Sequence, residues 1–328
     1  MRQGIKVLTM ALLVFVVALQ SWTFSEFVVL KPGIARPAGD LGSIVGASPS
    51  QEKLLYTAVI AQRANVLDRI RAVFDKDVRL TPRSENIPGG VGWREYSQLL
   101  AKSMSESQKV AAAVAFREAG YRVPAQTTVV VDMALPKDRY RGLIVDGSAL
   151  ISVNDTAVRT AEAAYELLRK AESKGAARLV LRSPDAALAT IEVAGDPSDG
   201  DDLPYGLVLR TEYTFSFPME FVPTAAEASG SSAGLMLAIE LYDQLTGGKL
   251  VRSGLIAGTG AIRVDGAVEA VDGIPQKVIA ARRIGATAFV LPRENLAQAI
   301  EVAGGITLIP VDTFAQAIEA LRWLEGEE

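Results

Sequence analysis

The sequence contains neither histidine nor cysteine. A disulfide cannot cross-link this chain and a Cys/His zinc site cannot organise it, so its 328 residues have only apolar cores to fold around. Apolar residues make up 49% and charged residues 22% of the chain, which is the balance of a folded globular protein. At about 100–200 residues per domain, the length predicts more than one compact unit.

The same two absences restrict the chemistry. They exclude a Ser-His-Asp triad, a cysteine nucleophile and a Cys/His metal site. A hydrolase built from this sequence needs a serine or threonine activated by lysine or a carboxylate, or a metal held by oxygen ligands alone. The net charge of -4 provides no basic surface, so no nucleic-acid partner is expected.

An uncharged segment follows Arg2 and Lys6 and has the core VLTMALLVFVVAL. A helix over residues 7–24 would be about 27 Å long, close to the ~30 Å hydrocarbon core of a bilayer. We therefore expect a single-pass cell-membrane protein, with a cytoplasmic N-terminus and an extracytoplasmic region after about residue 30. A cleaved signal peptide is the alternative, although the residues after Leu19 offer no A-x-A cleavage site.

Breakers and changes of periodicity predict a multidomain α+β protein in four parts. Residues 1–30 form the cytoplasmic tip and transmembrane anchor, and residues 31–120 a juxtamembrane linker and helical region. Helices are expected over 66–74 and about 96–119 in the second part. A β-rich domain with one packed helix covers 121–195, and a domain of alternating strands and helices covers 203–328. The acidic, breaker-rich run GDPSDGDDLP marks the boundary between the last two parts.

The third part resembles PDZ domains. Residues 143–155 read LIVDGSALISVND, close to the PDZ signature that precedes the helix of the peptide groove, although its Gly-Asp order is inverted. A glycine-rich carboxylate-binding loop is not recognisable around residues 125–128. A domain that only spaces its neighbours remains the alternative to a peptide-binding domain.

A glycine- and serine-rich loop precedes an apolar helical run. Residues 230–234 read GSSAG, and the run extends over 235–245. Ser232 is thus expected at the start of a helix, where free N–H groups favour the oxyanion formed when a serine attacks a carbonyl. A G-x-S-x-G loop also occurs in α/β-hydrolases, but those enzymes need a histidine. A loop that merely caps the helix is the structural alternative.

A lysine lies near the start of another expected helix. Pro275 suits the first position of that helix and places Lys277 in its opening turn. A lysine with the ordinary pKa of ~10.4 is a poor base at pH 7. Burial and the positive end of the helix disfavour the ammonium and could lower the pKa to about 7–8. A solvated surface lysine is the alternative for an isolated residue of this kind.

Residues 215–292 resemble the proteolytic domain of Lon peptidases. The family's Pro-Ser-Ala-Gly box corresponds to residues 231–234, and its Gly-Leu/Ile-x-x-Lys box ends at Lys277. Between and after these boxes, further pieces follow in family order: LTG at 245–247, GTG at 258–260, the turn at 264–266, GA at 285–286 and VLP at 290–292.

The resemblance implies roles for individual residues. Ser232 would be the nucleophile and Lys277 the base, and Thr259 would hydrogen-bond the lysine. The backbone N–H groups around Ser231 to Ala233, next to Gly230, would form the oxyanion hole. Two positions depart from the family pattern: Ser231 replaces proline, and residue 229 is serine where an acidic residue is common.

Over almost the whole chain, the predicted parts resemble bacterial membrane-anchored PDZ-domain-containing Lon-type serine peptidases that lack an ATPase. This implies an ATP-independent endopeptidase that acts through an acyl-enzyme on extracytoplasmic proteins or peptides. No cofactor, metal or nucleotide is expected, because no G-x-x-x-x-G-K-[ST] loop occurs. The resemblance also implies a homo-oligomer. The alternative function is a catalytically silent membrane-anchored scaffold that binds peptides through its PDZ-like domain.

Overall fold

The computed structural model describes residues 26–135, 140, 142–172, 175–194, 203–224 and 229–326, together with Lys6, Met10, Ala11 and Phe15. The chain forms two compact units. Unit 1 comprises residues 1–87, 103–121 and 219–328, and unit 2 comprises 88–102 and 122–218. This division differs from the predicted boundaries, because each unit is assembled from separated stretches of the chain. Most of the predicted boundary at 195–204 lies outside the described residues.

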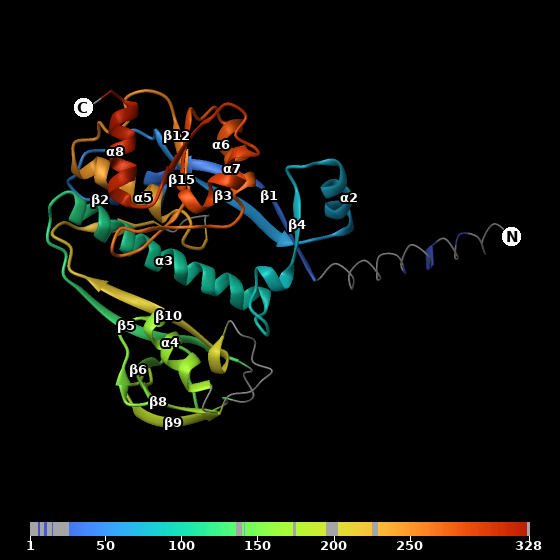
Figure 1. The fold of residues 1–328 in the computed structure, drawn as a ribbon, viewed down its shortest axis with the longest axis vertical. Coiled ribbons are helices and arrows are strands. Elements are labelled where there is room, and N and C mark those ends of the chain that lie inside the picture. Colours follow the sequence, from blue (N-terminus) through green and yellow to red (C-terminus); the bar gives the residue numbers. More distant parts are fainter. Residues whose placement is uncertain are drawn as a thin grey trace. The chain divides into compact units, whose positions relative to one another are not determined.

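Unit 1 contains a six-stranded sheet in the order β16-β15-β12-β3-β1-β4. Its strands are β1 (Phe27–Pro37), β3 (Leu54–Arg63), β4 (Arg79–Pro82), β12 (Ile256–Gly258), β15 (Ala288–Pro292) and β16 (Thr307–Val311). Strands β3, β12, β15 and β16 run parallel, whereas β1 is antiparallel to both of its neighbours. Blue strands from the beginning of the chain therefore lie beside orange strands from its end (Figure 1).

The stretch 31–120, expected to be a linker and a helical region, supplies most of β1 and all of β3, which are inner strands of this sheet. Proline and glycine near residue 32 suggested irregular structure, but β1 accommodates them at a change of register between Pro32 and Ala35. The apolar start of β3, Leu54 to Tyr56, is buried and pairs with β12. The described structure is accordingly mixed α/β.

Helices surround the sheet of unit 1. They are α2 (Val66–Phe74), α5 (Gly234–Leu245), α6 (Ile274–Arg283), α7 (Leu296–Ile300), α8 (Phe314–Leu324) and the second half of α3 (Trp93–Glu118). Helix α5 is buried from Gly234 to Gln244, and α6 packs on β1, β3 and β12. Two short ladders complete the unit, one of β2 (Gly42–Ile44) with β11 (Phe221–Pro223) and one of β13 (Ala261–Ile262) with β14 (Val268–Glu269). Single 3₁₀ turns are η1 (Ala38–Leu41), η2 (Arg83–Glu85) and η4 (Arg293–Asn295).

The two helices predicted before residue 120 are present as α2 and α3. The apolar positions that identified α2 are not its packed face, however, because Val73 is 74% and Phe74 84% exposed. The buried residue of this helix is Asp68, which forms a capping box with Asn65 and an ion pair of 2.6 Å with Lys31. Helix α2 is therefore held to β1 by this ion pair and by Ala72, which packs against the small core that contains Val29.

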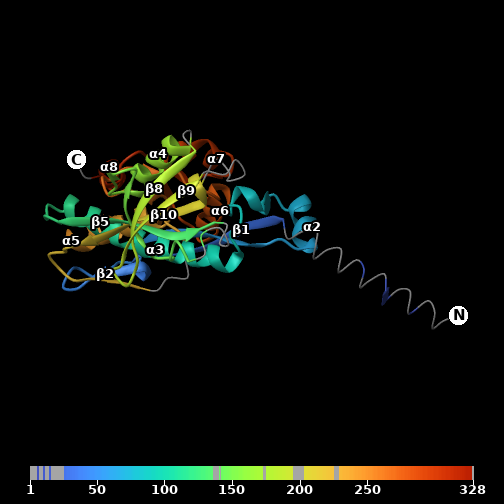
Figure 2. The same ribbon diagram turned by 90° about the horizontal axis from the view of Figure 1, so that it is seen from below.

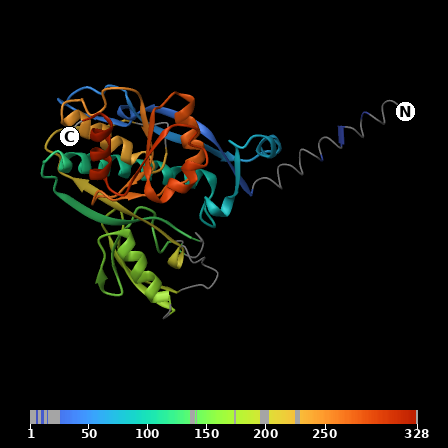
Figure 3. The ribbon, with the colours of Figure 1, turned by 45° about the horizontal axis from the view of Figure 1, so that its top comes forward.

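Unit 2 is built on a second sheet, in the order β10-β5-β6-β8-β9, with β7 paired to β6. Its strands are β5 (Ala125–Ala134), β6 (Ala149–Val153), β7 (Thr156–Ala157), β8 (Ala176–Arg182), β9 (Leu188–Ala194) and β10 (Leu207–Phe215). Helix α4 (Ala161–Glu172) shares a core with this sheet through Leu168, Leu150 and Leu179. Figures 2 and 3 show α4 beside these strands. Strand β10 was predicted to belong to the C-terminal part, but it pairs with β5 along its whole length.

Helix α4 is also hydrogen-bonded to the outer edge of β10. The hydroxyl of Tyr165 accepts from the N–H of Leu209 at 2.7 Å and donates to the carbonyl of Leu207 at 3.2 Å. At the start of the helix, the N–H of Ala161 donates to the hydroxyl of Thr211 at 2.8 Å. The η3 turn (Pro204–Gly206) leads into this strand. The Tyr165 side chain thus satisfies two backbone groups of β10, the carbonyl of Leu207 and the N–H of Leu209, to which a further strand would otherwise pair.

No described helix is long and apolar enough to cross a membrane. A span needs about 20 largely apolar residues in one helix. The 26-residue α3 carries charged side chains throughout, and the apolar α5 has only 12 residues. This finding contradicts the N-terminal transmembrane helix in the predicted fold class and the single-pass membrane localisation. Most of the predicted segment 7–24 lies outside the described residues.

Candidate active site

The loop that carries Ser232 leads directly into α5. Gly230 has φ +82°, and α5 begins at Gly234, in agreement with the predicted helix start. The N–H of Gly234 donates to the carbonyl of Ser231 at 3.0 Å and closes a tight turn around Ser232. Ser231 and Ser232 are half-buried, whereas Ala233 is buried. The serine therefore lies in a turn of defined geometry at the N-terminus of a core helix.

The main chain of Ser232 is bound to the segment that follows β12. Its carbonyl accepts from the hydroxyl of Thr259 at 2.9 Å and from the N–H of Gly260 at 2.8 Å. Thr259 is 0% exposed and donates its own N–H to the carbonyl of Val290 on β15 at 3.0 Å. The resemblance implied that Thr259 hydrogen-bonds the lysine, and this stays a prediction. Its hydroxyl donates to the backbone at the serine, and its oxygen can still accept a hydrogen bond.

Helix α6 places Lys277 in its first turn. The helix is preceded by Gly273 at φ +71° and has Pro275 as its second residue, and the N–H of Lys277 donates to the carbonyl of Gly273 at 3.0 Å. A Cβ on Gly273 would lie 2.7 Å from Val59 on β3. Only glycine suits both the backbone angle and this approach. The start of α6 is consequently fixed against β3.

Lys277 is desolvated, as the sequence predicted. Its side chain is 3% exposed, and burial lowers its pKa to about 7, because the ammonium loses its hydration. The exposed Asp272 opposes this effect by attracting the ammonium. At neutral pH, roughly half of the molecules would carry an uncharged amine here. This property distinguishes Lys277 from an ordinary surface lysine.

Ser232 and Lys277 belong to the same unit and to neighbouring elements. Gly258 pairs with Tyr56 on β3, so Thr259 and the stretch of β3 that touches Gly273 both lie towards the carboxyl ends of these strands. Within the described contacts, no hydrogen bond joins the Ser232 hydroxyl to the Lys277 amine. Catalytic hydrogen bonds are often long before substrate binds, so the arrangement is compatible with a dyad.

Two backbone donors next to the serine have no acceptor in the described part of the chain. The N–H of Gly234 is bound by Ser231 and that of Leu235 by the carbonyl of Gly260 at 3.0 Å. The N–H groups of Ser232 and Ala233 have no comparable partner among the described residues. They are the groups that an oxyanion could use.

Sequence analysis missed residues that support this region. Thr57 on β3 is fully buried and donates its hydroxyl to the carbonyl of Gly258 at 3.0 Å. Ser107 on α3 donates to the carbonyl of Ser231 at 3.2 Å. Both are distant from the serine box in sequence. Thr57 is a polar residue among apolar ones and Ser107 lies in a polar run, and neither pattern identifies a partner.

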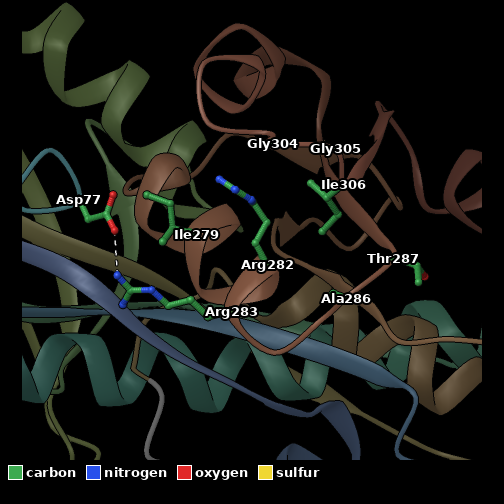
Figure 4. A pocket seen from close by; sticks show the side chains of 9 residues that line it. All are labelled: Asp77, Ile279, Arg282, Arg283, Ala286, Thr287, Gly304, Gly305 and Ile306. Carbon is green, nitrogen blue, oxygen red and sulfur yellow. Dashed lines mark hydrogen bonds and ion pairs between the residues drawn. The ribbon is translucent and has the colours of Figure 1, made fainter.

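A pocket of about 800 Å³ lies on the later turns of α6. Figure 4 shows Arg283 directed towards Asp77, with which it forms an ion pair of 2.8 Å. Arg282 donates to the carbonyl of Val302 at 2.9 Å. Both guanidinium groups are engaged in contacts within the protein, and neither Ser232 nor Lys277 lines the pocket. It is separate from the candidate site.

No group of three or more aspartates or glutamates in the described ranges is arranged to hold a metal ion. The chemistry available at the site is therefore considered from its serine, its lysine and its backbone donors.

Comparison with known proteins assigns the surrounding domain. Residues 218–321 match the family model of the Lon protease (S16) C-terminal proteolytic domain. A Lon protease of Chloroflexus aurantiacus is 38% identical over 98 residues, which cover 29% of this chain and 12% of that protein. Lon protease 2 of Bacillus subtilis is 28% identical over 99 residues, covering 30% and 18% respectively. A Lon protease of Anaeromyxobacter dehalogenans is 31% identical over 118 residues, covering 36% and 13%.

The matched region thus spans between 12% and 18% of the length of these three relatives. The chain contains a Lon-type proteolytic domain, and the prediction of a hydrolase of the serine peptidase type is confirmed. The match begins at residue 218, yet the same structural unit includes strands from residues 27–82.

Proposed function

We propose that this chain is an ATP-independent serine endopeptidase that uses Ser232 as nucleophile and Lys277 as general base. One observation carries the proposal: Lys277 is buried in the first turn of α6 with a pKa of about 7. A lysine with this pKa can accept a proton at neutral pH, which an ordinary lysine does rarely. No histidine is available for that role.

The reaction follows from these two side chains. The neutral amine of Lys277 takes the proton of the Ser232 hydroxyl while the oxygen attacks the peptide carbonyl. The resulting ammonium then protonates the leaving amine, and an acyl-enzyme on Ser232 remains. Lys277, neutral again, removes a proton from water, which attacks the acyl group. As the bond to the acyl group breaks, the ammonium returns this proton to the Ser232 oxygen and the second product is released.

The tetrahedral oxyanion would be stabilised by the N–H groups of Ser232 and Ala233. Their role is supported by the absence of other acceptors in the described structure and by their position at the N-terminus of α5. The hydrogen bonds from Thr259 and Gly260 to the Ser232 carbonyl hold this backbone in place before substrate arrives. Small neighbours, Gly230 and Ala233, leave room for a substrate main chain.

We propose unfolded or exposed segments of proteins as substrates, cleaved without nucleotide or cofactor. Addition of ATP and Mg²⁺ to the purified full chain should leave its rate of casein cleavage unchanged. A homo-oligomer, implied by the family resemblance, stays a prediction that light scattering of the same preparation can test.

The catalytic serine can be tested against its neighbour. The full chain should cleave fluorescent casein and react with a fluorophosphonate probe. Ser232→Ala should lower the cleavage rate at least about 1,000-fold and abolish labelling, because the nucleophile is lost. Ser231→Ala serves as the matched control and should keep both activities. Unchanged cleavage in Ser232→Ala would contradict the assignment.

The base can be tested by pH dependence. Since only the neutral amine is active, kcat/KM for a casein-derived peptide should rise through about pH 7 and reach a plateau above it. Lys277→Arg keeps the charge but stays protonated, so it should be inactive over the whole range. A rate that is flat between pH 6 and 8, or an active Lys277→Arg variant, would remove Lys277 from the mechanism.

The alternative is a catalytically silent scaffold that binds peptides through the PDZ-like unit 2. Such binding commonly adds a peptide strand to a free sheet edge. At β10 this edge is hydrogen-bonded to Tyr165 and Ala161 of α4, which weighs against the alternative. Two results together would favour the scaffold: the full chain leaves casein uncleaved, and Ser232→Ala binds peptides as the wild type does.

A further inference from the structure

Two adjacent residues of α3, Ser107 and Gln108, donate hydrogen bonds to backbone carbonyls that precede the nucleophile in sequence. Ser107 donates to the carbonyl of Ser231 at 3.2 Å. Gln108 donates through its amide nitrogen to the carbonyls of Leu41 at 2.7 Å and Thr224 at 2.9 Å. The two carbonyls at residues 224 and 231 are therefore held by neighbouring positions on one helix.

Ser107 packs closely against the start of α5 as well. It is 6% exposed, and a Cβ added to Gly234 would collide with its hydroxyl oxygen. Its hydroxyl thus lies directly behind the turn formed by residues 231–234. No other side chain in the described part of the chain donates to the Ser231 carbonyl.

Gln108 is 5% exposed, so its hydrogen bonds form in a setting with little competing water. Thr224 also donates its N–H to the carbonyl of Leu41 at 3.1 Å. Gln108 therefore joins three pieces of unit 1: α3, the end of η1 and the residue after β11. This buried amide is costly to remove, because the carbonyl of Thr224 loses its partner and the carbonyl of Leu41 keeps only the N–H of Thr224.

We propose that Ser107 and Gln108 are positioning residues for Ser232, and this inference rests on the proposed function. They touch neither the reacting atoms nor substrate. Instead, Ser107 holds the carbonyl of the residue before the nucleophile, and Gln108 holds the next position of α3 to Leu41 and Thr224. The carbonyls of Ser231 and Ser232 are then held from two directions, by α3 and by the residues after β12.

Ser107 offers the cleaner test, because Ser107→Ala deletes one hydroxyl and leaves a methyl group, a small change in side-chain volume. Ser107→Ala should lower kcat for peptide cleavage by about tenfold with KM changed less than twofold, since a small displacement of a nucleophile affects the chemical step first. The rate of fluorophosphonate labelling should fall by a similar factor. The midpoint of the pH–rate profile should stay at its wild-type value, because Lys277 keeps its surroundings.

Ser105→Ala is the matched control: it changes the same residue type on the same helix at an exposed position. It should leave kcat, KM and labelling unchanged. Ser107→Thr retains the hydroxyl and should recover more of kcat than Ser107→Ala does. Gln108→Glu replaces two donated hydrogens by an acceptor and should reduce labelling more strongly than Ser107→Ala at a temperature where circular dichroism reports a folded chain.

The outcomes separate this inference from the proposed function. Wild-type activity that depends on Ser232, combined with normal kcat in Ser107→Ala, would overturn the positioning role and leave the dyad intact. Ser107→Ala could also lose activity only because it unfolds at a lower temperature. If its kcat returned to the wild-type value on cooling, the positioning role would be overturned as well. If the wild type neither cleaves nor labels at Ser232, the proposed function itself fails.

Discussion

Burial of Lys277 affects catalysis and stability in opposite directions. The native state has a lysine pKa of about 7, whereas an unfolded chain has about 10.4, so the unfolded state binds the proton more tightly. Below pH 7 both states are protonated and the full cost of a buried ammonium is present. As the pH rises from 7 to about 10, that cost disappears, and stability is gained.

Lys277→Met should therefore yield a more stable and inactive protein. The gain in the free energy of unfolding should be roughly 3–5 kcal/mol at pH 6, as an upper bound from the pKa difference, and should shrink as the pH approaches 10. Urea unfolding at several pH values measures it. Lys249→Met, at an exposed lysine of the same unit, is the control and should show no such trend. A gain independent of pH would argue that better packing, and not the lost charge, is responsible.

Among the elements, α4 occupies the free edge of β10 through the hydroxyl of Tyr165. Burial raises the pKa of Tyr165, so its hydroxyl stays protonated, and it both accepts from Leu209 and donates to Leu207. A peptide strand added here would need the same two backbone groups. The helix and a peptide consequently compete for one edge.

Tyr165→Phe should destabilise unit 2 by about 1–3 kcal/mol, because the N–H of Leu209 and the carbonyl of Leu207 lose their partner in a buried setting. Hydrogen exchange of the Leu209 amide should accelerate along with the global loss. Tyr121→Phe, at a partly exposed tyrosine of unit 1, should leave both measurements at the wild-type level. Unchanged protection of Leu209 in Tyr165→Phe would mean that the hydroxyl contributes nothing to this edge.

The helices that carry the site could be predicted because their signals are local. Residues 230–234 predict the start of α5, and Pro275, which follows Gly273 closely, predicts the start of α6. The turn at residues 263–267 also forms between β13 and β14 as expected. The helix predicted over 66–74 is present, but its periodicity does not mark a packed face: Val73 and Phe74 are exposed, while Asp68 forms an ion pair with Lys31 and Ala72 contacts the core. The contacts of Ser107 depend on tertiary structure and leave no pattern in the sequence.

For the whole molecule, the proteolytic unit could not be delimited from sequence. Thr57 and Gly258, which share a hydrogen bond, are 201 positions apart. No local pattern encodes such a pairing, and the family match covers only residues 218–321. The resemblance placed the Lon-type domain in the later part of the chain, in agreement with this match, whereas the strands from residues 27–82 that complete its sheet were taken mainly for a linker and a helical region.

A fragment of residues 203–328, cut at the predicted boundary, should therefore not fold. It keeps β12, β15 and β16 but lacks β3, whose Leu55 packs with Ala257 and Phe289 in one core. Urea titration followed by near-UV circular dichroism should show no cooperative transition for this fragment. Residues 26–328 contain the described parts of both units and should unfold cooperatively. A cooperative transition in the shorter fragment would show that β1, β3 and β4 are dispensable.

The pairing of β3 with β12 has a consequence for the protein while it is being made. Strand β3 leaves the ribosome long before β12, and the intervening residues include those of unit 2, which can collapse on its own while β3 still waits for its neighbour. Neither Ser232 nor the buried Lys277 can reach its final surroundings until residues 256–277 have emerged. The candidate site therefore forms only after the whole of unit 2 has been synthesised.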